Sequence, residues 1–135
     1  MTEAKHRLVK SWLLKAQRDL AAARKLANDP DPYLDTAIYH CQQAAEKAIK
    51  AALVLYDQPF EKTHDIRSLI LLAITFENKF SDWLDVGGLL TPYATEFRYP
   101  GESLEPSPEE FQHALKSSED FCSFILSLLP SDAHP

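Results

Sequence analysis

One uninterrupted stretch, from Tyr33 to Tyr56, limits what this chain can fold into. It reads YLDTAIYHCQQAAEKAIKAALVLY and contains neither Gly nor Pro. Its apolar residues recur at helical spacing and make one broad face: Leu34, Ala37, Ile38, Cys41, Ala44, Ala45, Ala48, Ile49, Ala52 and Leu53. Many of these side chains are small, which lets neighbouring helices approach closely. The stretch therefore predicts one long helix at the centre of a helical protein.

A polar stripe lies on a different side of the same predicted helix. At about 100° per residue, His40, Gln43, Lys47 and Lys50 fall together. Imidazole, amide and ammonium groups could bind an anion or a nucleotide. The alternative is an ordinary solvated face with Glu46 and Lys50 as an i,i+4 ion pair. The spacing alone favours the solvated face, because such faces are common on surface helices.

Length and composition point to one ordinary domain. The chain has 135 residues, 45% hydrophobic and 25% charged, which is typical of a globular protein with its own core. We expect a single domain over residues 1–135 with an ordered core of about residues 4–129. No apolar run approaches the roughly 18 residues that cross a bilayer. The first residues lack the apolar segment of a signal peptide, so we expect a cytoplasmic location and no membrane partner.

The net charge and the cysteines exclude some functions. A formal charge of −6 and a pI near 5.3 argue against general binding to nucleic acid or to anionic membranes. A local basic pocket remains compatible with these values. Cys41 and Cys122 each stand in an apolar helical context, and we interpret both as buried free thiols. Neither has a Cys or His partner at metal-ligand spacing, so we expect no metal site.

Two further segments complete the first half of the chain. A helix is expected over about residues 3–28, with Asp19 among its water-facing residues. The sequence NDPDP ends it, because Pro30 and Pro32 cannot continue a helix. Asp31 is the expected N-cap of the second helix, with Pro32 at its first position. A link this short favours an antiparallel helix pair.

Three more helices are expected after Tyr56. Thr63 is the expected cap of the third, with Asp65 in its first turn. The fourth runs from about residue 81 to 97 with a kink or break near Thr91, because Gly87, Gly88 and Pro92 weaken it. The sequence RYPGESLEPSP is expected to be an exposed loop. Ser107 opens a capping box for a fifth helix to about residue 129, and SDAHP is expected to fray. The fold class is therefore all-α, an up-and-down bundle of about five helices.

Two other groups of polar residues could bear on function. His64 and Asp65 suggest a metal-dependent hydrolase, but no further ligands follow in a matching pattern, and helix capping explains the acid without a metal. Arg98 and Tyr99 stand where the fourth helix gives way to the loop. Arg98 could stabilise the helix C-terminus, or it could reach over the polar stripe to meet a phosphate. The sequence therefore favours helix capping over a metal site at His64 and Asp65, and it leaves the two roles of Arg98 open.

The motifs of several enzyme classes are missing. Gly87 and Gly88 lack the Lys and Ser/Thr of a P-loop. No Ser or Cys stands in a recognisable nucleophile context. We therefore expect neither a catalytic residue nor a cofactor from the motifs alone.

Taken in order, four segments resemble the HEPN domain family. They are WLLKAQRDLAAARKL in the first helix, AIYHCQQAAEKAIKAAL in the second, THDIRSLI opening the third and TPYATEFRYPG ending the fourth. The similarity extends over nearly the whole chain from Trp12 to Leu129, and HCQQAAEKAIKA is its most specific segment.

The resemblance implies a fold, partners and a site. Members are helical bundles, usually homodimers, and many are encoded beside or fused to a minimal nucleotidyltransferase; the domain has been proposed to bind nucleotides. By this resemblance the polar cleft would consist of His40, Gln43, Lys47, His64, Arg98 and Tyr99. A further expectation is a role in a toxin–antitoxin-type system.

Other members of the family are metal-independent ribonucleases, which use an Arg, a polar residue and a His a few residues later. Here Arg98 is followed by YPGESLEP, and the next histidine is the distant His113. The motif is missing, which favours a non-catalytic nucleotide-binding or accessory subunit over an enzyme. Two alternatives stay open. One is a degenerate ribonuclease in which His40 or His64 works with Arg98. The other is a structural dimer that docks another protein.

Overall fold

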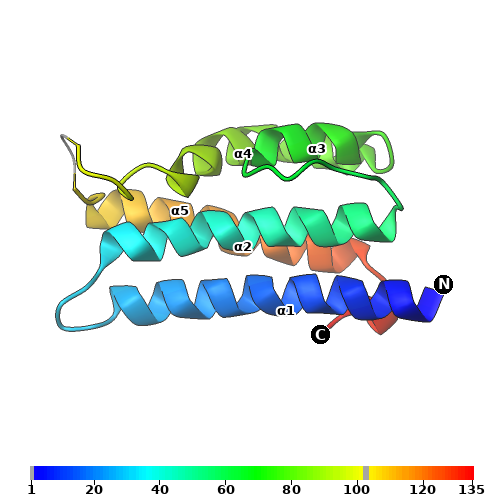
Figure 1. The fold of residues 1–135 in the computed structure, drawn as a ribbon, viewed down its shortest axis with the longest axis horizontal. Helices are drawn as coiled ribbons and strands as arrows, with labels where there is room; N and C mark the ends of the chain where they lie inside the picture. Colours follow the sequence, from blue (N-terminus) through cyan, green and yellow to red (C-terminus); the bar gives the residue numbers. More distant parts are fainter. Residues whose placement is uncertain (1, 102–103) are drawn as a thin grey trace.

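The computed structural model describes residues 2–101 and 104–135 and is helical throughout (Figure 1). Its long helices are α1 (Thr2–Ala27), α2 (Leu34–Leu55) and α5 (Pro108–Leu128). Two short helices, α3 (Ile66–Ile74) and α4 (Leu84–Leu90), follow α2 in the chain. Three short 3₁₀ segments, η1 (Asn78–Trp83), η2 (Thr91–Ala94) and η3 (Ser131–Ala133), complete the described elements. The expected all-α bundle of about five helices is confirmed.

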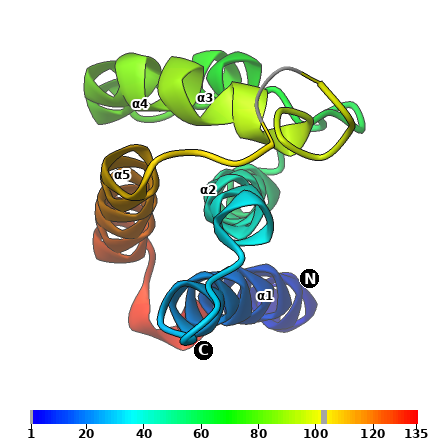
Figure 2. The same ribbon diagram turned by 90° about the vertical axis from the view of Figure 1, so that its left-hand side faces the viewer.

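Helix α2 is the centre of the bundle. Seen end-on in Figure 2, α1 lies on one side of α2, the α3–α4 layer lies on the opposite side, and α5 lies beside it. Its contacts are most extensive with α1, and it also packs against α5, α3 and η2. The small residues explain this position, because they are fully buried and let three neighbours approach: Ala37, Ala44, Ala45, Ala48, Ala51 and Ala52.

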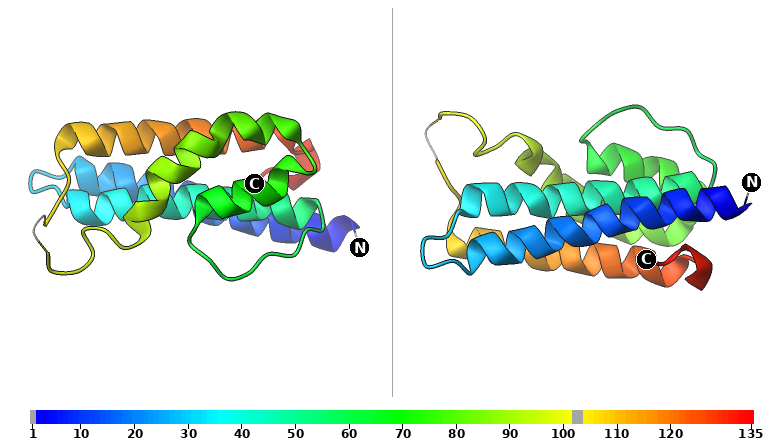
Figure 3. Two further views of the ribbon diagram at one scale, coloured as in Figure 1. Left: turned by 90° about the horizontal axis from the view of Figure 1, so that it is seen from above. Right: turned by 60° about the horizontal axis from the view of Figure 1, so that its bottom comes forward.

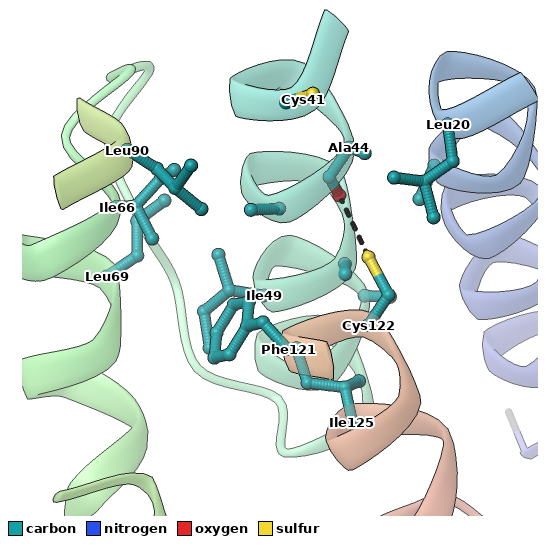
Figure 4. Packing of buried hydrophobic residues seen from close by; sticks show 14 of the residues in the cluster. Leu20, Cys41, Ala44, Ile49, Ile66, Leu69, Leu90, Phe121, Cys122 and Ile125 are labelled. Carbon is teal, nitrogen blue, oxygen red and sulfur yellow. Dashed lines mark hydrogen bonds between the residues drawn. The ribbon is translucent and has the colours of Figure 1, made fainter. Parts of the chain in front are cut away.

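Larger side chains fill the space around this small-residue face. Figure 4 shows Ile49 of α2 between Ile66 and Leu69 of α3 on one side and Phe121 of α5 on the other. Phe80 of η1 contacts Phe121 edge-on, with ring centroids 6.4 Å apart. This cluster fastens the α3–α4 layer onto α2 and α5.

Several helix ends differ from the sequence expectations. The N-cap of α2 is Tyr33 rather than Asp31, and its side chain makes no capping hydrogen bond. Asp31 instead turns its backbone N–H to the Asp29 carboxylate. Helix α2 ends in a Schellman motif, in which the N–H of Asp57 donates to the carbonyl of Val54 and the N–H of Gln58 donates to the carbonyl of Leu53. Asp57 adopts a φ of 56° there, a conformation that short polar side chains tolerate.

Helix α3 has an aspartate as its N-cap, and helix α5 has a serine. Asp65, expected in the first turn of α3, is itself the N-cap and accepts from the N–H of Ser68. Thr63, the expected cap, accepts from the N–H of Asp65 instead. Ser107 caps α5 as expected, accepting from the N–H of Glu110. The Glu110 carboxylate does not close the capping box; it accepts from the Tyr93 hydroxyl at 2.6 Å and so ties η2 to α5.

The expected fourth helix is divided into shorter pieces. A 3₁₀ turn precedes α4, α4 ends at Leu90, and η2 follows at the kink expected near Thr91. The C-terminal residues expected to fray form η3, and Ala133 is fully buried against the bundle. Glu102 and Ser103 of the expected exposed loop lie outside the described residues.

Candidate functional site

The polar stripe of α2 forms internal networks and is not a solvated face. Gln43 and Lys50 are only 8% and 7% exposed, and Glu46 is 4% exposed. The stripe lies on the side of α2 away from α5, because α5 contacts the opposite side through Ser118 and Cys122. Within the described part of the chain, every buried side-chain nitrogen and oxygen has a hydrogen-bond partner. The interpretation as an ordinary solvated face is therefore wrong.

The first network joins α1 to α2 through Asp19. Its carboxylate accepts from Nδ1 of His40 at 2.8 Å and from Nζ of Lys47 at 2.6 Å. A carboxylate can only accept here, so Nδ1 of His40 carries a proton and donates it to Asp19. Asp19 was expected to face water and is 7% exposed. Its burial is compatible with its charge because two donors about two turns of α2 apart converge on it.

The second network surrounds Glu46. One carboxylate oxygen accepts from Nδ1 of His64 at 2.8 Å and from the amide of Gln42 at 3.1 Å. The other accepts from Nζ of Lys50 at 2.8 Å. The amide of Gln43 donates to Oε1 of Gln42 at 2.7 Å, which links the two glutamines. The His64 side chain is 65% exposed, whereas that of Glu46 is 5% exposed. A buried carboxylate thus holds an exposed imidazole in one orientation.

The charge of Glu46 is stabilised despite its burial. Burial alone raises the pKa of the carboxyl group, but the hydrogen bonds from Lys50, His64 and Gln42 outweigh it, and the net pKa shift is downward. Glu46 therefore stays ionised at neutral pH. The ionised carboxylate fixes the His64 tautomer with the proton on Nδ1 and leaves Nε2 directed at solvent.

Aromatic side chains cover Lys50. Its Nζ lies 5.8 Å from the ring centroid of Trp12 in α1 and 5.8 Å from that of Phe60 in the α2–α3 connector. Lys50 thus contacts a carboxylate and two ring faces, which accounts for a lysine that is almost fully buried. It is a structural part of the network and is not accessible to a ligand.

Arg98 lies over the N-terminal half of the same face. Its guanidinium carbon is 3.7 Å from the ring centroid of Tyr39. Phe97, directly before it, has a φ of 66°, an uncommon value for a bulky side chain, and stacks on Tyr93. The strained turn at Phe97 reverses the chain so that Arg98 returns to α2. Arg98 thus packs on Tyr39 of α2 instead of stabilising the C-terminus of the expected fourth helix. Tyr99 is 72% exposed and is free to contact a ligand.

The candidate residues divide into exposed and internal groups. His64, Arg98 and Tyr99 are exposed, and His40 and Lys47 are partly exposed on the same side of α2. Gln43 is enclosed by its bonds to Gln42 and Glu46. Arg98 contacts Tyr39 and His64 contacts Glu46, and these two anchoring residues are seven positions, or about 10 Å, apart along α2.

Three residues of the site were missed by the sequence analysis: Asp19, Tyr39 and Glu46. Asp19 and Tyr39 gave no signal beyond their helical positions. Glu46 was seen only as a surface ion-pair partner of Lys50. Its position three residues after Gln43 placed it at the edge of the stripe, which was the available signal.

Among the residues that the structure describes, neither a metal-binding cluster nor any of the five hollows named below lies at these groups. No cluster of three or more His, Cys, Asp or Glu side chains suited to a metal occurs in residues 2–101 and 104–135. Five well-defined hollows are lined by other residues, and one of about 390 Å³ adjoins the connector through Phe60 and Thr63. A ligand would therefore bind on the open side of the network.

Two other expectations concern the thiols and the membrane. Cys41 and Cys122 are buried and free, as expected, and burial raises the pKa of each thiol to about 12. Both thiols therefore stay protonated at neutral pH. Of the helices that the structure describes, none has the length and apolarity to cross a bilayer.

The fold and the polar face define a class of protein: a small helical bundle with one central helix and a charged network on its uncovered side. The sequence model of the HEPN domain matches residues 9–128, which is most of the chain. The chain belongs to the HEPN domain family.

A solved structure supports the assignment. The crystal structure of an archaeal HEPN homologue aligns with a TM-score of 0.68 and 25% sequence identity, covering 89% of this chain and 96% of that one. No curated protein matches the chain with significance.

Proposed function

We propose that this HEPN domain binds a nucleotide on the open side of the α2 network and serves as a non-catalytic accessory subunit of a minimal nucleotidyltransferase. The observation that carries the proposal is the pair of exposed groups on one helix face. His64 is fixed by Glu46, and Arg98 is fixed on Tyr39, about 10 Å away along α2. A nucleotide has phosphates at one end and a base at the other, so it suits two groups anchored at different positions along α2.

The chemistry of the two groups suits the two ends of such a ligand. The guanidinium of Arg98 makes paired hydrogen bonds to phosphate, and the exposed ring of Tyr99 offers a surface for stacking. Nε2 of His64 and Nε2 of His40 can meet a base edge or a phosphate oxygen according to their protonation. In this proposal Gln43 and Lys47 act through the networks, since their donors already bond to Gln42, Glu46 and Asp19.

Calorimetric titration with ATP and with GTP tests the binding. We expect Arg98→Ala and His64→Ala each to weaken binding by about tenfold or more, the usual cost of one charge-assisted hydrogen bond. Lys79→Ala is the control, because Lys79 is exposed on η1, away from α2. Inorganic phosphate should bind much more weakly than either nucleotide. Unchanged affinity in both variants would reject the site.

The partner and the oligomer are tested separately. We propose a homodimer that associates with a nucleotidyltransferase subunit in a toxin–antitoxin-type pair, as the family resemblance implies. Sedimentation velocity gives the mass of the purified chain. Co-elution with the candidate nucleotidyltransferase on size exclusion tests the accessory role, and separate elution at all concentrations would reject it.

One observation favours a second candidate, a degenerate ribonuclease. The Glu46–His64 pair is arranged like the carboxylate and imidazole of a general base, with the accepting nitrogen exposed. Arg98 would then stabilise the charge that develops on the phosphate. Incubation with single-stranded and structured RNA decides the question. Cleavage that persists in His64→Ala and His40→Ala would exclude this mechanism, and no cleavage by the unaltered protein would exclude the activity.

A further inference from the structure

The charge of this chain is distributed very unevenly. Helix α1 carries seven Lys and Arg residues against Glu3 and Asp19, a formal charge of +5. The rest of the chain carries seven Lys and Arg against 18 Asp and Glu, a formal charge of −11, which gives the net −6. An acidic protein therefore presents one strongly basic helix. The right-hand view of Figure 3 shows α1 in front, with no described element over its outer side.

Helix α1 has a second seam beside the one that enters the core. The core seam is Val9, Leu13, Ala16, Leu20 and Ala23, which are all buried. The second seam has the same alternating spacing of three and four residues: Leu8, Trp12, Lys15, Asp19, Ala22 and Leu26. Such spacing is typical of a helix that packs against another helix. Asp19 is paired with Lys47 and hydrogen-bonded to His40 inside the bundle, so the uncovered part of this seam is apolar and cationic.

Two hollows lie along the second seam. One of about 230 Å³ is lined by Leu8, Ser11, Trp12 and Lys15. The other, of about 320 Å³, lies at the end of α1 and is lined by Ala22, Lys25, Leu26, Asp29 and Tyr33. Their exposed lining is mainly apolar, with Leu8 50% and Tyr33 56% exposed. Their centres are about 13 residues apart on α1, or about 20 Å. Each hollow is large enough for one or two apolar side chains, and both lie at or below the lower end of the range of small-molecule pockets.

Exposed cations line the same side of the helix. Lys15 stands at the first hollow, Lys25 stands at the second, and Arg18 lies between them. Within the described residues, none of these three forms an ion pair closer than 4 Å. The surface thus combines two apolar hollows with a row of unpaired positive charges.

We propose that this surface of α1 docks an acidic amphipathic helix of a partner protein. Two apolar side chains about four turns apart would enter the hollows, and carboxylates beside them would meet Lys15, Arg18 and Lys25. Nucleic acid fits less well, because a phosphate backbone leaves the two apolar hollows unfilled. A second copy packing α1 against α1 would bring its own cations onto these cations. The inference does not depend on nucleotide binding.

Fluorescence anisotropy with labelled model peptides tests the surface on the full chain. The probe is a helical peptide of about 20 residues with leucines about four turns apart and glutamates beside them. One comparison peptide has alanine in place of each leucine, and another has lysine in place of each glutamate. The Lys15→Glu, Arg18→Glu double variant changes the surface, and Lys79→Glu is the matched control at an exposed cation elsewhere. Circular dichroism confirms that each variant is folded, which we expect because the changed side chains are exposed.

We expect the acidic leucine peptide to bind, the double variant to lose about tenfold or more in affinity, and Lys79→Glu to change it little. Leu8→Ser should weaken binding without altering its salt dependence, because it removes an apolar contact. The proposal is overturned if neither comparison peptide binds more weakly than the probe, or if the double variant binds equally well. It is also overturned in favour of nucleic acid if a single-stranded RNA oligomer binds more tightly than the peptide with the same dependence on Lys15 and Arg18. Dissociation of a dimer by the double variant in sedimentation would assign the surface to a second copy instead.

Discussion

At the scale of single residues, the central feature is a buried carboxylate that organises its neighbours. Glu46 bonds to Lys50, His64 and Gln42, and no apolar side chain could replace those three acceptor roles. The same carboxylate keeps Lys50 charged between Trp12 and Phe60. Removing it would leave a buried ammonium group without a counter-ion, which costs far more than the net value of the pair.

Glu46→Gln is therefore expected to destabilise the protein by about 3–5 kcal/mol at neutral pH. The variant keeps the side-chain volume but presents an amide to Lys50. Urea unfolding followed by circular dichroism measures the free energy of unfolding. Asp82→Asn is the control, because Asp82 is exposed on η1 and should change stability little. A loss no larger than the control would contradict the role assigned to Glu46.

The pH dependence of stability follows from the same group. The pKa of Glu46 in the folded protein lies below its ordinary value of 4.5, so the unfolded chain binds the proton more readily. The stabilisation is fully present above about pH 4.5 and is lost as the pH falls through the lowered folded pKa. Urea unfolding between pH 7 and pH 3 should show this loss in the unaltered protein and less of it in Glu46→Gln. Equal slopes in the two proteins would assign the acid sensitivity to other carboxyl groups.

The residues found and missed by sequence reasoning differ in a physical way. His40, Lys47 and Lys50 were identified because helical periodicity places them on one side of a single helix. Asp19 was assigned to the solvent because its burial depends on how α1 registers against α2, which periodicity within one helix does not contain. The sequence analysis named reaching over the stripe as one of two roles for Arg98, but it did not identify Tyr39 as the partner, because that contact depends on the turn at Phe97, where no Gly marks the positive φ. Positions on one face of a helix were thus predictable, whereas the particular partners contributed by other elements were not.

At the scale of elements, the closest packing in the α3–α4 layer depends on a glycine. A Cβ added to Gly87 would lie 2.9 Å from Cδ1 of Ile70 and 3.1 Å from Cα of Arg67. The second of these is backbone and cannot turn aside. Gly88, the next residue, would meet only the side chain of Arg67 at 3.9 Å. Adjacent glycines in α4 therefore have different roles.

Gly87→Ala and Gly88→Ala should change stability in opposite directions. Gly87→Ala forces α3 and α4 apart and is expected to cost about 1–3 kcal/mol, more than the gain in helix propensity. Gly88→Ala adds a side chain at an exposed helical position and is expected to stabilise by up to about 1 kcal/mol. Thermal unfolding of the two variants beside the unaltered protein checks both. Equal effects of the two substitutions would show that α3 and α4 are not in close contact at Gly87.

The sequence also located most helices but not how they end. The antiparallel α1–α2 pair and the Ser107 cap followed from Pro and Ser positions, and both are present. The sequence predicts that both glycines of α4 lower the stability of that helix, whereas the structure shows that close packing against α3 requires Gly87. A glycine in the sequence indicates a position of low helix propensity, but only the neighbouring helix shows whether the missing side chain is needed for close packing.

At the scale of the whole molecule, the N-terminal helix α1 packs against both α2 and the C-terminal segment η3. The α1–α2 pair carries the polar network, and η3 contacts α1 from the C-terminal side. Ala133 is fully buried there, and Nε2 of His134 lies 3.1 Å from the carbonyl of Leu129. Segment η3 therefore holds the C-terminal end of the chain against α1, the helix that carries the basic surface.

Ending the chain after Pro130 is expected to lower the free energy of unfolding by about 1–2 kcal/mol, because it exposes the α1 surface that Ala133 covers. Amide hydrogen exchange should also become faster in the N-terminal turns of α1, since local opening no longer has to displace η3. Ending the chain after Ala133 is the matched control: it keeps the buried methyl group and loses the two His134 hydrogen bonds, from its backbone N–H to Ser131 and between its ring and the Leu129 carbonyl. A full effect in that control would assign the stabilisation to His134, and no effect in the longer deletion would mean that η3 does not hold α1 in solution.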